Sequence, residues 1–190
     1  GHKISCVSIA VSEEEVFVFP MLEEIKPVFK RLLENKKIGK IAQNMKFEHN
    51  WSDWILDAQV EGWMFDTMLA SHILDNRKYI TGLKFQVYVQ FGIVDYDSSV
   101  SKYLTEIREG EDPKDGNRFN RIDEAPEMEL LYYCGMDSLL EYRLAMIQME
   151  LIEEDEGLTI GTYYDCFDKN CNFVEFITQE ERNNITWEDV

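Results

Sequence analysis

Basic residues are scarce in this 190-residue chain, which has 19 Lys and Arg against 37 Asp and Glu and a formal net charge of −18. A protein that coats duplex DNA normally carries a basic patch, so this composition argues against broad, phosphate-driven binding. The acidic excess does not exclude an enzyme that acts on nucleic acid, because carboxylates can hold the cations that such an enzyme uses.

Cysteine, histidine and long apolar runs are also in short supply. The 4 cysteines lie apart from the 3 histidines and do not make a structural zinc site by themselves, so we expect reduced thiols in an intracellular chain. No apolar run is long enough to span a membrane, and no signal-peptide pattern is present. These observations predict a cytoplasmic protein that does not bind a membrane.

Apolar residues make up 45% of the sequence and aromatic residues 13%, which is enough for the core of one domain. An acidic stretch at 152–157 separates an expected domain at 1–157 from an extension at 158–190, which is aromatic and β-prone and then polar. The extension contains one good strand candidate, 172–178.

The order of local patterns in the first part predicts an α/β domain. Two β-rich runs joined by an acidic turn predict a hairpin, and apolar spacing of three and four then predicts helices between short strands. The charged stretch 110–120 is expected to be a loop. The expected strands are 3–11, 16–19, 40–43 and 60–64, and the expected helices are 22–35, 44–56, 67–74, 82–91 and 126–151.

The last of these helices carries the first candidate site. Leu140, Leu144 and similar residues form an apolar stripe, and Tyr133 and Asp137 lie four residues apart on one face. A carboxylate on a mostly apolar face is costly unless it is paired, hydrogen-bonded or bound to metal. The alternative is that Asp137 lies at the edge of the stripe and faces water.

A second candidate site lies where the strand at 40–43 ends and the next helix begins, since ligand sites in α/β sheets favour strand ends. Gln43, Asn44 and Glu48 are the polar residues there. Asn44 and Glu48 also have simpler interpretations, because Asn44 can cap the helix and Glu48 can interact with its positive end. Phe47, Trp51, Trp54 and Ile55 of this helix are expected to face inward.

Four motifs in order are more specific than any one of them. They are Asn-x-x-Phe-Glu at 44–48, Phe-Asp-Thr-Met-Leu at 65–69, Gly-Leu at 82–83 and Tyr-x-x-x-Asp at 133–137. Together they resemble the proofreading 3'-5' exonuclease domain of family A DNA polymerases, especially bacteriophage versions, from about residue 3 to residue 151. The resemblance implies a ribonuclease H-like fold, a mixed sheet flanked by helices.

The resemblance also implies roles for individual residues. Asp137 and Glu48 would bind two divalent ions, Mg²⁺ or Mn²⁺, with Glu48 standing where the family usually has Asp. Tyr133 would orient the attacking water, so Tyr133, Asp137 and Glu48 are the expected catalytic residues. The substrate would be the frayed, single-stranded 3' end of DNA, contacted by Gln43, Asn44 and Arg77.

One motif of the family, the Asp-x-Glu of its first and central strand, is not found. By the resemblance it would lie shortly before Gly1, so the sheet is expected to lack that strand. We favour the hypothesis that it is encoded upstream or separately. Alternatively a partner chain, such as a polymerase, supplies it, or the run 172–178 is inserted there, with Glu175, Glu180 and Glu181 replacing part of the motif.

Two functions follow. The first is a metal-dependent proofreading exonuclease that is inactive if the motif is truly absent, located in the host cytoplasm if a phage encodes it. The second is a catalytically dead, exonuclease-like module that binds or scaffolds a replication protein. The retained Tyr133, Asp137, Asn44 and Arg77 favour the first, whereas Glu48 and the strong acidity favour the second.

Overall fold

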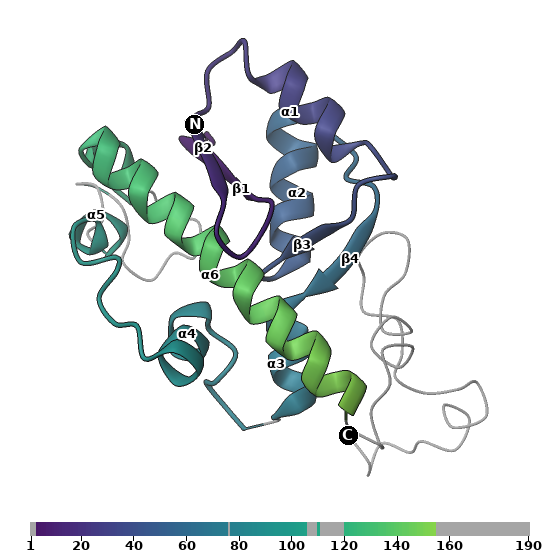
Figure 1. Cartoon of the computed structure of the whole chain (residues 1–190). Helices are drawn as coiled ribbons and strands as arrows, with labels where there is room; N and C mark the ends of the chain where they lie inside the picture. The colour runs from purple at the N-terminus through teal and green to yellow at the C-terminus, as the bar shows by residue number, and fades with distance from the viewer. Residues whose placement is uncertain (1–2, 76, 106–109, 111–119, 155–190) are drawn as a thin grey trace.

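The computed structural model describes residues 3–75, 77–105, 110 and 120–154. The expected extension 158–190, and most of the expected loop 110–120, lie outside these residues. The elements in chain order are β1 (Cys6–Ala10), β2 (Val16–Pro20), α1 (Lys26–Leu33), β3 (Lys40–Ala42), α2 (Met45–Leu56), β4 (Trp63–Asp66), α3 (Thr67–Leu74), α4 (Leu83–Phe91), α5 (Ser101–Thr105), the 3-10 turn η1 (Ile122–Glu124) and α6 (Glu127–Glu154) (Figure 1).

The described strands form two separate pairs. β1 and β2 are antiparallel, with Ser8 opposite Val18, which confirms the predicted hairpin. β3 and β4 are parallel and are connected through α2. No ladder joins β1 to β3 among the described residues, so each of these two strands has hydrogen-bonded neighbours on one side. The domain is α/β, as predicted.

The long helix α6 organises the fold, because it contacts β1, β2, β3, α3 and α4 (Figure 1). It can approach the hairpin closely because residue 135 is glycine: a Cβ there would lie 2.7 Å from Val18 Cγ2. Hydroxyl contacts reinforce this packing, since Ser8 Oγ donates to the carbonyl oxygen of Cys134 at 2.7 Å and lies 2.5 Å from Ser138 Oγ.

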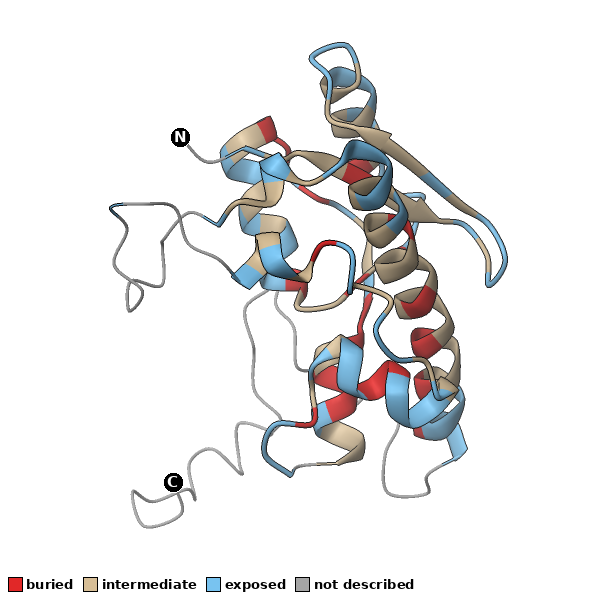
Figure 2. Ribbon diagram, turned by 90° about the vertical axis from the view of Figure 1, so that its left-hand side faces the viewer, coloured by how far each residue is buried: buried red, intermediate tan, exposed pale blue. Residues whose placement is uncertain are grey.

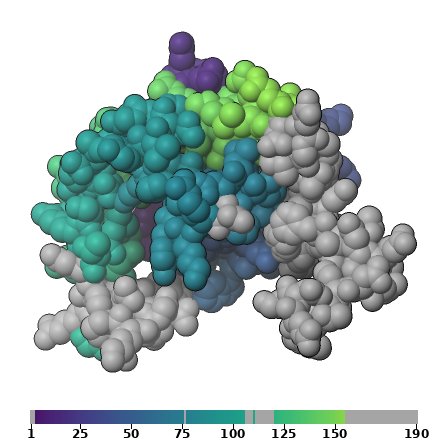
Figure 3. Space-filling model, turned by 90° about the horizontal axis from the view of Figure 1, so that it is seen from below, coloured from purple at the N-terminus to yellow at the C-terminus, as the bar shows by residue number. Residues whose placement is uncertain are grey.

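The C-terminal half of α6 packs on β4 and α3. Leu140 and Leu144 are fully buried, as the apolar stripe predicted, and Ala145 and Ile152 join Phe65 in one core cluster. Figure 2 shows buried residues gathered where α6 faces α3, and Figure 3 shows the surfaces of these two helices side by side from below. α3 and α6 are thus held by apolar burial, worth about 1.5–3 kcal/mol for each large side chain.

Three sequence predictions about local structure are wrong in detail. The helix expected at 22–35 is helical only over Lys26–Leu33, where Pro27 occupies the first turn. The strand expected at 60–64 is Trp63–Asp66, because Gly62 has a φ of 74° and breaks extended geometry before it. Phe47 and Trp54, expected to face inward, are 53% and 68% exposed.

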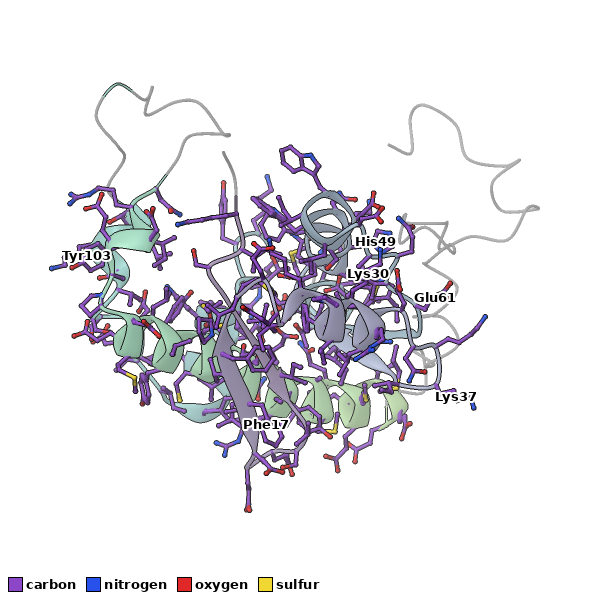
Figure 4. All side chains as sticks on the ribbon, turned by 90° about the horizontal axis from the view of Figure 1, so that it is seen from above. Phe17, Lys30, Lys37, His49, Glu61 and Tyr103 are labelled. Atoms are coloured by element: carbon purple, nitrogen blue, oxygen red, sulfur yellow. The ribbon has the colours of Figure 1, made fainter. Side chains whose placement is uncertain are left out.

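The aromatic side chains of α2 contact one another along the helix. Ring centroids are 5.9 Å apart for both Phe47–Trp51 and Trp51–Trp54. His49 of α2, seen in Figure 4, accepts a hydrogen bond at Nδ1 from Trp63 Nε1 at 3.2 Å and so helps to hold α2 beside β4. None of the helices in the described ranges is long and apolar enough to cross a bilayer.

Candidate active site

The Asp66 carboxylate connects the starts of two helices. Oδ1 accepts the backbone N–H groups of Met68 and Leu69 at 2.9 and 3.3 Å, so Asp66 caps α3. The same carboxylate accepts the N–H of Asn44 at Oδ1 (3.0 Å) and that of Met45 at Oδ2 (2.8 Å). Burial raises the pKa of Asp66, and these amide bonds oppose the rise.

Asn44 does not cap α2 with its own side chain, in contrast to the simpler interpretation of its sequence position. It adopts a left-handed backbone conformation, with φ 65°, and makes no side-chain cap hydrogen bond. Asp66 replaces that cap from β4, 22 residues later in the chain. The sequence gives no local signal for this arrangement, because the donor and the acceptor meet only when β3 pairs with β4.

Gln43 is held at both ends of its amide group. Its Nε2 donates to the carbonyl oxygen of Thr81 at 2.8 Å, and its Oε1 accepts the Thr67 hydroxyl at 2.5 Å. The side chain therefore connects the end of β3 to α3 and to the loop before α4. Among the described residues, these contacts give Gln43 a structural role alongside the expected substrate contact.

Asp137 and Tyr133 lie together on α6, as the four-residue spacing predicts, and they are half-buried. Burial raises the pKa of Asp137, while hydrogen bonds from the Tyr133 and Tyr96 side chains oppose the rise. The Tyr96 hydroxyl donates to Asp137 Oδ1 at 2.8 Å. Asp137 is thus hydrogen-bonded within the protein, which contradicts the alternative that it simply faces water.

Tyr96 also packs on Tyr133. The two rings are stacked, with centroids 6.2 Å apart and planes inclined by 23°. The Lys84 ammonium group of α4 lies 5.5 Å from the centre of the Tyr133 ring and forms an ion pair with Asp97. Tyr96 and Lys84 were not identified from the sequence, because nothing in the spacing of α4 and the following loop shows that they reach α6.

Glu141 is a further carboxylate that sequence reasoning missed. Desolvation raises its pKa well above the ordinary value, and the charges of Glu48, Asp137 and Asp66 raise it further. The N–H of Gln43 donates to Glu141 and partly offsets this. Its position four residues after Asp137, on the same face of α6, is the signal that could have identified it.

Glu48 and Asp137 act on the same neighbours. Both raise the pKa of Glu141, and both oppose ionisation of the Cys134 thiol. The Glu48 side chain as a whole is exposed, yet the protein atoms around its carboxyl group raise the pKa of that group by desolvation. The described carboxylates therefore extend from α2 to α6 as one acidic region.

Among the described residues, Arg77 is hydrogen-bonded to Asp75 and not to residues of α6. Its Nε donates to Asp75 Oδ1 at 3.0 Å and to Oδ2 at 2.9 Å, and the guanidinium group is exposed. The two residues belong to the connection between α3 and α4, whose far end is held by Gln43 at Thr81. Arg77 is therefore presented at the surface by a loop that is anchored beside β3.

The described residues do not by themselves fit a two-metal centre. No three Asp, Glu, His or Cys side chains among them form a group that could hold a metal ion. The hydrogen bonds explain part of this: Asp66 accepts four backbone amides, and Asp137 Oδ1 accepts the Tyr96 hydroxyl. Asp137 and Glu48 would need additional carboxylates to complete such a site.

Comparison with known proteins gives the class to which this domain belongs. A family model described as 3'-5' exonuclease, from family A DNA polymerases, matches residues 2–152. The chain therefore belongs to the 3'-5' exonuclease domain family of these polymerases, as its motifs predicted. The family acts on DNA ends, and its members generally use divalent metal ions. No curated protein matches the chain.

Proposed function

We propose that this chain is a proofreading 3'-5' exonuclease domain that hydrolyses phosphodiesters at a single-stranded 3' end of DNA. The observation that carries the proposal is the pairing of Tyr133 with Asp137 on α6, in a chain of the exonuclease family. The proposed site residues are Tyr133, Asp137 and Glu48 for catalysis, and Gln43, Asn44 and Arg77 for the substrate.

The chemistry of the side chains supports these roles. A phenol both donates and accepts hydrogen bonds, so Tyr133 is suited to holding an attacking water beside a phosphate. The Lys84 ammonium group, 5.5 Å from the Tyr133 ring centre, adds positive charge next to this position. It is a candidate for attracting a phosphate to an otherwise acidic region.

Asp137 and Glu48 are the proposed ligands of divalent ions, but the described residues lack the further carboxylate that the site needs. We propose that a strand carrying such carboxylates lies between β1 and β3 and completes a ribonuclease H-like sheet. The division of the described strands into two pairs supports this, because β1 and β3 would each gain the neighbour that they lack. α6 already contacts both strands.

The proposed strand has three sources to distinguish. It precedes Gly1 in the same polypeptide, it belongs to a partner such as a polymerase chain, or it is the run 172–178, which lies outside the described residues. In each case it would form backbone hydrogen bonds to two strands and bury carboxylates beside Asp137 and Glu141. Charge repulsion there would make divalent ions a condition for tight association.

The second candidate function is an exonuclease-like module that does not hydrolyse DNA and binds a replication protein instead. The observation that favours it is the absence of a three-ligand metal group among the described residues, together with the Tyr96 hydroxyl on Asp137 Oδ1. This alternative predicts that Asp137 can be replaced without any effect on DNA hydrolysis.

The experiment is a nuclease assay with a 5'-labelled single-stranded oligonucleotide, in Mg²⁺ or Mn²⁺, comparing this chain with its Asp137→Ala variant. Asp95→Asn is a matched control, because Asp95 is exposed and lies in the loop before Tyr96. A ladder shortened from the 3' end, lost in Asp137→Ala and kept in Asp95→Asn, supports the exonuclease. An inactive chain, or one unaffected by Asp137→Ala, rules out hydrolysis by this site in the isolated chain.

A chain extended by its upstream coding residues separates the two functions further. If the extension creates activity that depends on Asp137, the strand hypothesis is supported. If the extended chain is also inactive, an upstream strand is ruled out, and the assay is repeated with the polymerase partner added. Inactivity in both preparations contradicts the exonuclease proposal and leaves the binding module.

A further inference from the structure

Tyr96 makes a contact to the Tyr-x-x-x-Asp motif that the sequence motifs do not indicate. It lies in the loop between α4 and α5 and is 41 residues from Asp137 in the sequence, yet its hydroxyl reaches Asp137 Oδ1 at 2.8 Å. Its ring stacks on Tyr133. One side chain therefore contacts both residues of the Tyr-x-x-x-Asp motif from outside α6.

Contacts next to Tyr96 hold the loop that carries it. Ser98 N donates to the carbonyl oxygen of Asp95 at 3.1 Å, which closes a turn around Tyr96, and the next residue, Asp97, forms the ion pair with Lys84 on α4. Val100 is fully buried further along. These attachments restrict where the Tyr96 hydroxyl can lie, so its bond to Asp137 is a consequence of the fold.

We propose that Tyr96 is a positioning residue for the motif: its hydroxyl holds the Asp137 carboxylate in one orientation, and its ring sets the plane of Tyr133. The proposal rests on the proposed function, because Asp137 and Tyr133 are the groups that would act on the substrate. The hydroxyl groups of Tyr96 and Tyr133 then bind the same Asp137 carboxylate, so the orientation of Tyr133 depends on that of Tyr96.

The ring and the hydroxyl of Tyr96 have separable roles. A phenylalanine would keep the stacking on Tyr133 and the packing of the loop, since the ring is the same size. Only the hydroxyl reaches Asp137 Oδ1. Tyr96→Phe therefore removes the positioning bond alone, and its effect on Asp137 distinguishes positioning from packing.

The first test observes the orientation of Asp137 directly and needs neither metal nor DNA. The chain is labelled with ¹³C at the aspartate carboxyl carbon, and the Asp137 signal is assigned by its loss in Asp137→Ala. We expect Tyr96→Phe to move this signal. The matched control, Tyr103→Phe, removes the hydroxyl of a tyrosine on α5 (Figure 4) whose ring packs with Lys102, and it should leave the signal in place.

A double-mutant cycle in urea unfolding gives an independent measurement. Tyr96→Phe, Asp137→Ala and the double variant should show a coupling of about tenfold in the unfolding equilibrium constant, as one hydrogen bond to a charged group gives. The proposal is overturned if the Asp137 signal does not move in Tyr96→Phe, or if the two substitutions are additive to within about twofold.

Activity provides the functional readout and separates this proposal from the preceding one. In a preparation that degrades single-stranded DNA, Tyr96→Phe should lower kcat about tenfold and leave KM unchanged. The reason is that Asp137 and Tyr133 lose their fixed orientation, whereas the residues that contact the DNA are unaltered. A kcat equal to that of Tyr103→Phe would contradict positioning. If no preparation degrades DNA, the exonuclease proposal fails while the carboxyl signal still decides the role of Tyr96.

Discussion

The N–H of Met45 donates to Asp66 Oδ2 at 2.8 Å, so the first residue of α2 is bound to the last residue of β4. Asp66 also accepts the amides of Met68 and Leu69, so one carboxylate caps the N-terminal ends of two helices. This relationship holds the strand end with Gln43 and Asn44 in a defined position relative to α3.

Replacing Asp66 with Asn is expected to lower the free energy of unfolding by about 2–3 kcal/mol, since bonds to a charged acceptor are among the stronger ones. An amide oxygen can keep part of the set, but the amide nitrogen would face the N–H of another residue. Urea unfolding measures the change. Asp95→Asn is the control and should stay within about 0.5 kcal/mol, as exposed substitutions generally do.

The pH dependence of stability is expected to reflect Glu141. Its pKa in the folded chain is raised above the ordinary value of 4.5, so the folded state binds this proton more tightly than the unfolded state does. Stability should therefore fall as pH rises from about that value through the raised pKa. The Glu141→Gln variant keeps an acceptor for the N–H of Gln43 and removes the buried charge.

We therefore expect Glu141→Gln to be more stable than the parent chain at pH 7 to 8, with the difference shrinking toward pH 4.5. Thermal or urea unfolding at several pH values measures this. If the stability of the two chains changes with pH in parallel, the pKa of Glu141 does not differ between the folded and unfolded states, and the inference is wrong. Glu150→Gln, on the exposed side of α6, is the matched control.

The closeness of α6 to the hairpin predicts that Gly135→Ala destabilises the chain even though alanine favours helices. The added Cβ would lie 2.7 Å from Val18 Cγ2, and overpacking of this kind costs about 1–3 kcal/mol against a propensity gain of about 1. The net loss should be up to about 2 kcal/mol by urea unfolding. Adding Val18→Ala should recover most of it, and a failure to recover would place the strain elsewhere.

Gln43→Ala should loosen the connection between α3 and α4. The substitution removes the bond to the Thr81 carbonyl and the partner of the Thr67 hydroxyl, at a cost of about 1–2 kcal/mol. Trypsin reports the local effect, because Arg77 and Lys78 lie in this connection and are exposed. Faster cleavage after these residues is expected, whereas Gln59→Ala, at an exposed position, should leave the cleavage rate unchanged.

The sequence predicts those parts of the fold that depend on neighbouring residues. Alternation and apolar spacing identified the hairpin and the helices α1, α2, α3, α4 and α6. The inward orientation of Phe47 and Trp54 was predicted wrongly, because hydrophobicity does not say which face of α2 meets the strands.

The candidate site was predicted only in part, because spacing along the chain shows only which nearby residues share a face. Tyr133 and Asp137 share a helix face at any tertiary arrangement, so their proximity follows from the four-residue spacing. Tyr96, Lys84 and Glu141 were missed, since their contacts depend on how the α4–α5 region and the end of β3 lie against α6. The metal-ligand roles of Glu48 and Asp137 stay predictions.

By itself, the amino-acid sequence determined the order of helices and strands, the family of the chain and the pairing of Tyr133 with Asp137, because each depends on spacing along the chain. Only the tertiary structure decided that Asp66 closes α2 as well as α3, and that Tyr96 reaches Asp137. The physical reason is that hydrogen bonds and burial act over a few ångströms in space. They join residues 21 and 41 positions apart only once the chain has folded.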